Sequence, residues 1–271
     1  MNLVMPSQFG SSYSGPTQKA RVITEGWMAQ EGYCPACLSR LRPTAVNSRA
    51  IDFGCDDCGI PFQLKSMKSK IGMRVPDGAY ETMLSAVRGD SSPALLLMRY
   101  DLSAWMVRDL IAIPSFALTE QAIIPRKPLA PHARRAGWVG CNIDLGKIPP
   151  DARVRIVEEG KAHPRQSVAD KYARLKPLQS IGVKQRGWAL AVLNGIQNLG
   201  RLEFTTREAY QMESMMAQTF PGNSNVRPKI RQQLQVLRDL GLVEHLERGQ
   251  WRLPAESSLP ANSKTNKTNE S

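Results

Sequence analysis

The chain has 271 residues, of which 42% are hydrophobic and 22% charged, a composition that excludes wholesale disorder and a length that suits two domains. Its 36 Lys and Arg against 24 Asp and Glu give a formal charge of +12, which favours a polyanionic partner because basic groups placed on phosphates release counterions. Nucleic acid is the first candidate. A membrane partner is disfavoured, because no run approaches the roughly 20 apolar residues of a spanning helix and the first residues lack a charged region before an apolar stretch.

The first part of the chain predicts a mixed α and β domain. Apolar residues at Ala20, Ile23, Trp27 and Met28 follow helical spacing, and short alternating runs beside the second C-x-x-C pair have the pattern of strands. In chain order we expect a helix over residues 18–30, strands over 50–53 and 62–65, a turn at 76–78, a helix over 80–87, and buried strands over 94–100 and 105–113.

The second part of the chain predicts a winged helix-turn-helix. Residues 161–179 are polar and charged, and we expect a linker with some helix there. Three helical patterns follow at 188–197, 207–220 and 226–240, and then two short alternating strands at 243–246 and 250–253, an order typical of that fold. We therefore expect a first domain over residues 1–180, a winged-helix domain over 181–253, and a disordered tail over 254–271, where little can be buried.

Four of the five cysteines form two C-x-x-C pairs. Cys34 and Cys37 are separated from Cys55 and Cys58 by 17 residues, a spacing within the zinc-ribbon range. Four thiolates give a closed tetrahedral shell, so we expect a structural Zn²⁺; free thiols or a redox pair are the alternatives. Such thiolates suit a reducing compartment, and we expect a cytoplasmic protein. Cys141 stands among apolar neighbours and is expected to be a buried small residue.

The hairpin from Asp52 to Lys65 predicts a catalytic centre. Gln63 and Lys65 lie two residues apart on one strand, so their side chains share a face that Asp52 can join from the preceding strand. Phosphodiester hydrolysis needs a divalent cation and a positive group near the attacking water. We expect Asp52 and Gln63 to bind Mg²⁺ or Mn²⁺, and Lys65 to position or activate the water. The alternative is a solvated strand edge.

Two basic segments predict DNA-binding surfaces. The first is a loop whose basic residues lead to an aromatic one: Arg126, Lys127, Arg134, Arg135 and Trp138. The second is the third predicted helix of the winged-helix domain with its hairpin, which offers Lys229, Arg231, Gln232, Gln235 and Arg248. Gln can pair with adenine edges and Arg with guanine or phosphate, while Arg248 on the wing suits a phosphate. A core tryptophan and a solvated helix face are the alternatives.

At this point the chain resembles the DpnI family of restriction endonucleases over nearly its whole length up to Leu253. The blocks that carry the resemblance include Cys34-Pro35-x-Cys37, Asp52-Phe53-x-Cys55-x-x-Cys58, Phe62-Gln63-Leu64-Lys65-Ser66, Asp77-Gly78-Ala79-Tyr80, Arg126-Lys127-Pro128-Leu129-Ala130-Pro131, Ala133-Arg134-Arg135-Ala136-Gly137-Trp138 and Ile230-Arg231-Gln232-Gln233-Leu234-Gln235. The family pattern has an acidic residue at the position of Gln63. That substitution should weaken metal binding.

The resemblance implies an α+β fold: a PD-(D/E)XK restriction-endonuclease-like domain with an embedded zinc site of four cysteines, followed by a winged helix. It also implies cleavage of double-stranded DNA at GATC when the adenine is methylated. In the family the segment matching residues 126–138 belongs to the recognition surface, with the residue matching Trp138 against the methyl groups. An indole can bury such a methyl while Arg and an Asn, here Asn142, read base edges.

Three hypotheses follow from these residues. The first is a methyl-directed endonuclease. The second is a DNA-binding protein with an inactive nuclease fold, which Gln63 favours, and the third is an active nuclease with a different target or no methyl dependence. Glu25 could support the metal as a further acidic group, although a surface carboxylate is the simpler interpretation. No dimerisation helix is evident, so we expect a monomer.

Overall fold

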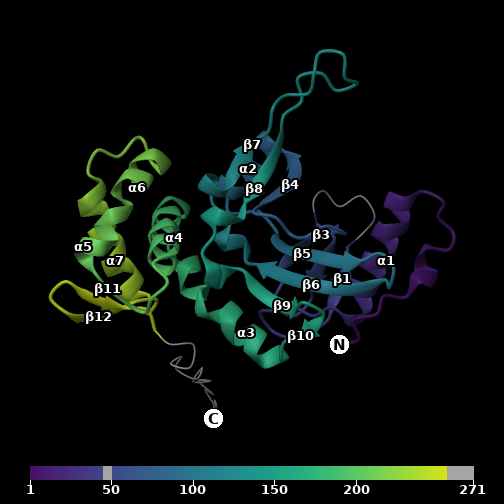
Figure 1. The fold of residues 1–271 in the computed structure, drawn as a ribbon, viewed down its shortest axis with the longest axis horizontal. Helices are drawn as coiled ribbons and strands as arrows, with labels where there is room; N and C mark the ends of the chain where they lie inside the picture. Colours follow the sequence, from purple (N-terminus) through teal and green to yellow (C-terminus); the bar gives the residue numbers. More distant parts are fainter. Residues whose placement is uncertain (45–50, 255–271) are drawn as a thin grey trace, which may run out of the picture.

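The computed structural model describes residues 1–44 and 51–254 of the chain. Figure 1 shows two lobes side by side, a larger one built around a sheet and a smaller one made mainly of helices. Ala50 of the first predicted strand and nearly all of the tail expected to be disordered lie outside the described residues. None of the helices in the described ranges is both long and apolar enough to cross a membrane.

The larger lobe is centred on a seven-stranded sheet with the order β1-β2-β3-β5-β6-β9-β10. Its strands are β1 (Leu41–Pro43), β2 (Phe53–Cys55), β3 (Pro61–Met67), β5 (Ala94–Asp101), β6 (Met106–Ile113), β9 (Val154–Glu158) and β10 (Lys161–Ala162). β3 and β5 run parallel, and every other neighbouring pair is antiparallel. The first five residues of β5 are fully buried, which explains their unbroken apolar run, because both faces of the sheet are covered.

The two faces of this sheet belong to two hydrophobic clusters. Leu96 and Met98 of β5 join one cluster with helices α1 (Pro16–Glu31) and α3 (Arg165–Arg174). Leu95 and Leu97 point the other way and join a cluster that extends through the second sheet into the helical lobe. The alternation of a strand thus places Gln63 and Lys65 of β3 on the second face, opposite α1.

A second sheet packs against that face. It has the order β4-β8-β7, with β4 (Arg74–Ala79), β7 (Ile123–Pro125) and β8 (Gly140–Asp144), and helix α2 (Tyr80–Arg88) follows β4 directly. The turn expected at residues 76–78 is wrong: these residues lie within β4. Pro76 is tolerated because β4 is an edge strand, and Gly78 lies where the register shifts between Asp77 and Ala79.

The helical lobe follows the predicted order with additions. It contains α4 (Val183–Gln197), β11 (Glu203–Thr205), α5 (Thr206–Ala209), α6 (Glu213–Thr219), α7 (Val226–Asp239), β12 (Glu244–Glu247) and β13 (Gln250–Arg252). The single helix expected at 207–220 is two helices separated by a 3-10 turn, and β11 completes a sheet with the order β11-β13-β12. Further 3-10 helices lie at Ser7–Gly10, Ser115–Ala117, Glu120–Ala122, Leu145–Lys147, Pro150–Ala152 and Lys176–Ser180.

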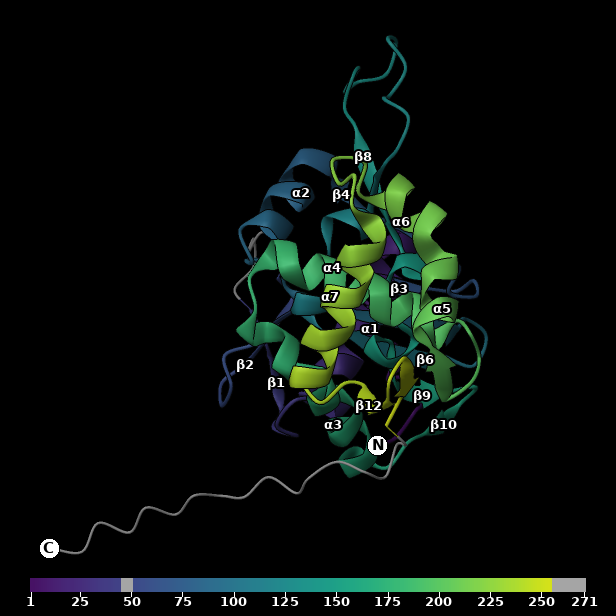
Figure 2. The same cartoon turned by 90° about the vertical axis from the view of Figure 1, so that its left-hand side faces the viewer.

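Helix α4 joins the two lobes. The side chain of Arg186, 3% exposed, forms an ion pair with Asp90 of the larger lobe. Asn194 donates a hydrogen bond from Nδ2 to the carbonyl oxygen of Gly146 at 2.9 Å. Ala189, Val192 and Leu193 belong to the same buried cluster as Leu95. In Figure 1, α4 lies between the other helices of this lobe and the sheets, and Figure 2 looks onto the helical lobe.

Candidate functional site

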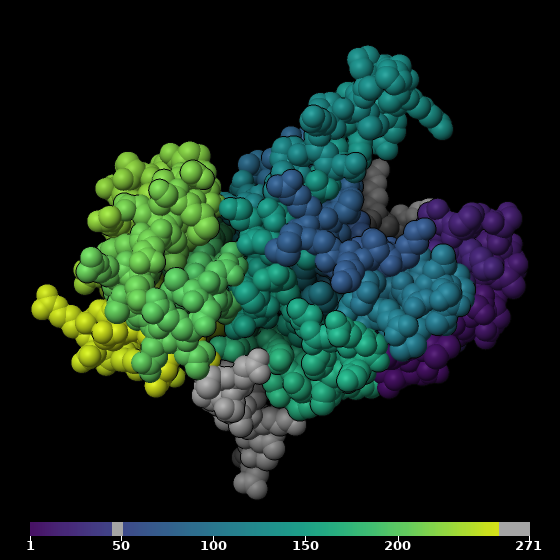
Figure 3. All heavy atoms as spheres, in the orientation of Figure 1, coloured from purple at the N-terminus to yellow at the C-terminus, as the bar shows by residue number. Residues whose placement is uncertain are grey.

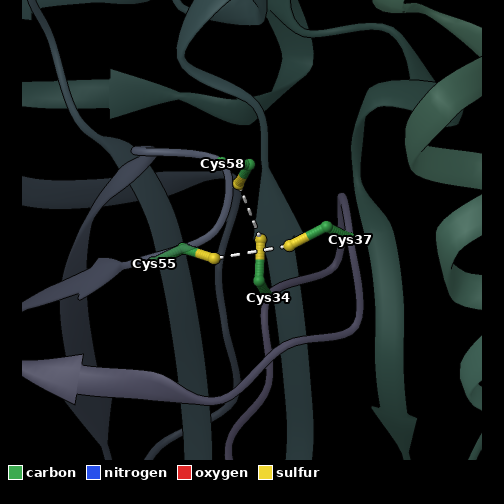
Figure 4. Close-up of side chains that lie close together, drawn as sticks. All are labelled: Cys34, Cys37, Cys55 and Cys58. Carbon is green, nitrogen blue, oxygen red and sulfur yellow. Dashed lines mark hydrogen bonds between the residues drawn. The ribbon is translucent and has the colours of Figure 1, made fainter.

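The four paired cysteines come together in one cluster. Cys34 follows α1 and Cys55 ends β2, and all four sulfur atoms lie within 4.8 Å of one another. The Sγ atoms of Cys34 and Cys58 are 3.5 Å apart and those of Cys37 and Cys55 are 3.3 Å apart (Figure 4). Four soft sulfur donors at this separation can hold a metal ion such as zinc.

The two C-x-x-C segments, which we call the first knuckle (residues 34–37) and the second knuckle (residues 55–58), repeat the same turn. The amide of Leu38 donates to the carbonyl oxygen of Cys34 at 2.8 Å, and the amide of Gly59 donates to that of Cys55 at the same distance. Both donors have positive φ, 68° for Leu38 and 71° for Gly59. Glycine accepts this conformation freely, whereas a leucine there costs about 1–2 kcal/mol. The fold of the first knuckle therefore holds Leu38 in a backbone conformation that leucine disfavours.

Burial dominates the thiol chemistry of the cluster. It raises the pKa of the Cys34 thiol far above its usual value and that of Cys58 to about 11. Burial also acts to raise the pKa of Cys37, but hydrogen bonds with Ser39, Cys55 and Cys34 together lower that pKa to about 7. A metal ion requires thiolates, so binding here releases protons. Tyr172 of α3 belongs to the same buried cluster as Cys34, and its pKa is raised by burial and then by the charges of Cys34 and Cys58.

The structure brings Asp52 opposite Gln63 of β3. Asp52 lies immediately before β2 and not in a strand as expected, yet its amide donates to the carbonyl oxygen of Phe62 at 2.9 Å. Its Oδ2 atom accepts a hydrogen bond from the amide of Leu64 at 2.8 Å. The register pairs Phe53 with Phe62, so one step further Asp52 faces Gln63. Cross-strand partners put their side chains on the same face.

Lys65 extends from this face to the second sheet. Its Nζ atom forms an ion pair with Oδ1 of Asp77 in β4, and the side chains of Lys65 and Asp77 are 22% and 5% exposed. Asp77 had no predicted role, because its proline and glycine neighbours indicated only a turn. Lys65 therefore lies where the two sheets meet, beside the Asp52–Gln63 pair.

Glu25, the further acidic group considered for the metal, is in an ion pair. Glu25 of α1 is engaged by Arg21, whose Nε donates to its Oε1 at 2.6 Å, so Glu25 is a salt-bridged surface carboxylate. The pKa of Arg21 is raised by that hydrogen bond, by the charge of Glu25 and by Asp52. Among the described residues the cysteines form the one group of at least three Cys, His, Asp or Glu close enough to share an ion. Asp52 and Gln63 offer hard oxygen donors that suit magnesium, which usually keeps several waters.

The basic loop is an arm between β7 and β8 that stands out from the body of the protein (Figures 1 and 3). No Asp or Glu occurs within residues 126–138. The basic side chains of the arm are all exposed: Arg126, Lys127, Arg134 and Arg135. Backbone hydrogen bonds brace its base, from Arg126 to Gly140 at 2.8 Å and from Leu129 to Trp138 at 3.0 Å. The arm thus presents positive charge to solvent.

Trp138 is not a core residue. It is half-buried at the base of the arm, with the guanidinium of Arg135 4.7 Å from its ring centroid. The ring lies against Gly140, where a Cβ atom would come within 2.8 Å of it. Asn142 is half-buried in β8, between Pro76 and Ile124 of the adjacent strands. Cys141, as expected, is fully buried.

Helix α7 presents a polar face opposite a buried stripe. Ile230, Leu234 and Leu237 are fully buried, whereas the exposed side carries Arg231, Gln232 and Gln235. Lys229 is half-buried and donates from Nζ to Oε1 of Gln232 at 2.8 Å. Arg248 is exposed in the turn between β12 and β13, next to Gly249 with φ 79°. This lobe carries a helix-turn-helix surface with a β-hairpin wing.

Two family models match the chain. Residues 1–181 match DpnI, described as the Dam-replacing family, and residues 184–253 match DpnI_C, described as the Dam-replacing HTH domain. The first match covers the cysteine cluster, the Asp52–Lys65 hairpin and the arm. The second covers α4 to β13.

Proposed function

The chain belongs to the DpnI family, and from this premise we propose that it is a type II restriction endonuclease that makes double-strand breaks at GATC sites with methylated adenine. The family indicates a methyl-directed restriction endonuclease, and the helix-turn-helix domain indicates DNA binding. We assign the nuclease domain to residues 1–180 and the winged-helix domain to residues 181–253. We also propose that the protein acts as a monomer in the cytoplasm, because metal-binding thiolates suit a reducing compartment.

The observation that carries this proposal is the placement of Asp52, Gln63 and Lys65 on one face of the large sheet, at β2 and β3. Asp52 and Gln63 would hold Mg²⁺ or Mn²⁺, which polarises a phosphoryl oxygen and lowers the pKa of a bound water. The Oδ2 atom of Asp52 accepts a hydrogen bond from the amide of Leu64, and we assign Oδ1 as the oxygen that binds the ion. Lys65 would orient the attacking water and offset the charge that develops on the phosphate.

The cysteine cluster would hold a structural Zn²⁺ close to this centre. Its second knuckle forms the turn between Asp52 and Gln63, and its first knuckle follows α1. A closed shell of four thiolates leaves no open coordination position for substrate. We therefore assign the ion to holding the catalytic hairpin in place and not to the reaction.

Recognition would be divided between the two lobes. The exposed cations of the arm suit backbone phosphates, while Trp138 at its base suits an adenine methyl group and Asn142 a base edge. Helix α7 would enter the major groove with Arg231, Gln232 and Gln235, supported by Lys229, and Arg248 would contact a phosphate.

One experiment tests the reaction and its target together. Purified protein and Mg²⁺ are incubated with the same plasmid prepared with and without adenine methylation at GATC. Cleavage of the methylated plasmid alone is the expected result. Cleavage of both forms would remove methyl dependence, and cleavage of neither, with a retained gel shift, would support the second candidate, a DNA-binding protein with an inactive nuclease fold. The observation that favours that candidate is Gln63 in place of an acidic residue.

A further inference from the structure

An ion pair between two sheets lies beside the candidate catalytic hairpin. Lys65 belongs to β3 of the large sheet and Asp77 to β4 of the second sheet. The carboxylate of Asp77 is almost completely buried, at 5% exposure, and the side chain of Lys65 is 22% exposed. The contact joins a residue of the proposed reaction to one without an assigned role.

Asp77 is the fixed partner of the pair. Its Oδ1 atom accepts a hydrogen bond from the amide of Gly78 at 2.8 Å in addition to the contact with Lys65. Its backbone pairs with Cys141 at the point where the register between β4 and β8 shifts. A short side chain held by its own strand can set the position of a long, flexible lysine, whereas the reverse is not expected.

Packing alone does not account for this pair. The two sheets already meet through buried apolar side chains, including Val75 and Ile143 on one side and Leu95 and Leu97 on the other. A buried ion pair is a weak source of stability, because removing both charges from water costs much of what their attraction gives. What the pair does provide is a defined place for the ammonium group.

We propose that Asp77 is the positioning residue of Lys65 and holds its ammonium group beside the Asp52–Gln63 pair. This inference rests on the proposed function, in which Lys65 acts on the attacking water. Asp77 is on the sheet that carries the basic arm, since its partner Cys141 is three residues beyond Trp138. The lysine is thus held by the same sheet that carries the proposed recognition surface.

The chain offers a matched control for removing this charge. Asp109 of β6 forms an ion pair with Arg99 of β5, with side chains 18% and 22% exposed, and its Oδ1 accepts from the amide of Glu159 at 3.0 Å. Asp77→Asn and Asp109→Asn therefore remove the same charge from similar surroundings, but Asp109 has no contact with Lys65. Both variants should unfold at similar temperatures in calorimetry.

The first readout does not require cleavage. Lys65 is labelled with an amine-reactive reagent, and its extent of modification is measured by mass spectrometry of the peptide. Because the ion pair shields the amine, Asp77→Asn should raise the labelling rate several-fold, whereas Asp109→Asn should leave it unchanged. Asp77→Glu, which keeps the charge, should stay closer to the wild-type rate. An Asp77→Asn rate equal to that of the control overturns the inference.

The second readout is cleavage of methylated plasmid. A displaced catalytic group can cost about 100-fold in rate, so kcat of Asp77→Asn should fall by up to that factor with little change in KM. In a Lys65→Ala background the same substitution should have no further effect, because its target is gone. Additive losses would overturn the inference. If the wild-type protein cleaves nothing, the proposed function fails by itself and the labelling rate still decides the role of Asp77.

Discussion

Gly140→Ala tests whether Trp138 reads the adenine methyl groups. A Cβ atom on residue 140 would lie 2.8 Å from Cη2 and 2.9 Å from Cζ3 of the indole ring. Carbon atoms pack at about 3.5–4.0 Å, so the ring must move by roughly 1 Å. Gly140 lies in β8 and is not among the glycines with positive φ, so alanine fits its backbone and the fold should persist.

The expected loss of preference for methylated DNA follows from the two methyl groups of a fully methylated GATC site. Burying one methyl group is worth about 0.8 kcal/mol, so two contribute about 1.6 kcal/mol, or roughly 15-fold in preference. The assay is the ratio of kcat/KM for methylated and unmethylated duplexes. Gly140→Ala should lower this ratio by up to that factor, and Trp138→Ala should do the same without adding to it. Gly72→Ala is the control, because a Cβ atom there meets nothing within 4 Å. An unchanged ratio in both test variants would refute the role given to Trp138.

Three further substitutions probe the metal sites. Gln63→Glu adds a carboxylate opposite Asp52, and the Mg²⁺ concentration for half-maximal cleavage should fall at least about tenfold, since one unit charge near a divalent ion is worth several kcal/mol even after screening. If this variant cleaves nothing at any Mg²⁺ concentration, the result supports an inactive nuclease fold. Cys34→Ala should abolish zinc binding, measured by atomic absorption, and lower the melting temperature far more than Cys141→Ala, because zinc binding contributes directly to folding. Leu38→Gly relieves a φ of 68° that costs about 1–2 kcal/mol but removes a side chain packed against the buried cluster, so the melting temperature should shift by no more than a few degrees. A large fall would show that the leucine side chain, and not its backbone strain, dominates at this position.

Local sequence patterns predicted the elements whose burial follows directly from their apolar residues. The helix over residues 18–30 appears as α1, because its apolar spacing follows the face it buries. The buried strands 94–100 and 105–113 appear as β5 and β6, because short apolar runs are typical of strands covered on both faces. The cysteine cluster was predictable because ligand spacing is set by the knuckle turn itself. The turn at residues 76–78 was wrong, since proline and glycine favour turns locally but are also tolerated in a bulged edge strand.

The contact between Lys65 and Asp77 had no signal in the sequence. It depends on how the second sheet packs on the first, and neither strand pattern records that arrangement. The half-buried position of Trp138 could not be predicted from the sequence for a similar reason. Its surroundings depend on the indole ring lying against Gly140 at the base of the arm, and composition alone is equally compatible with a core tryptophan.

The region expected to be a linker bears on how both lobes reach DNA. Within residues 161–179, α3 buries Val168 and Tyr172 against the large sheet, so the segment is packed and not free. Helix α4 then shares one hydrophobic cluster with both lobes, and its Arg186 is paired across the boundary. Lobes joined by a flexible linker are expected to move relative to each other, but a continuous core opposes such motion. In the proposed function, DNA therefore has to fit the base of the arm and α7 in this arrangement of the lobes, or engage the two one at a time.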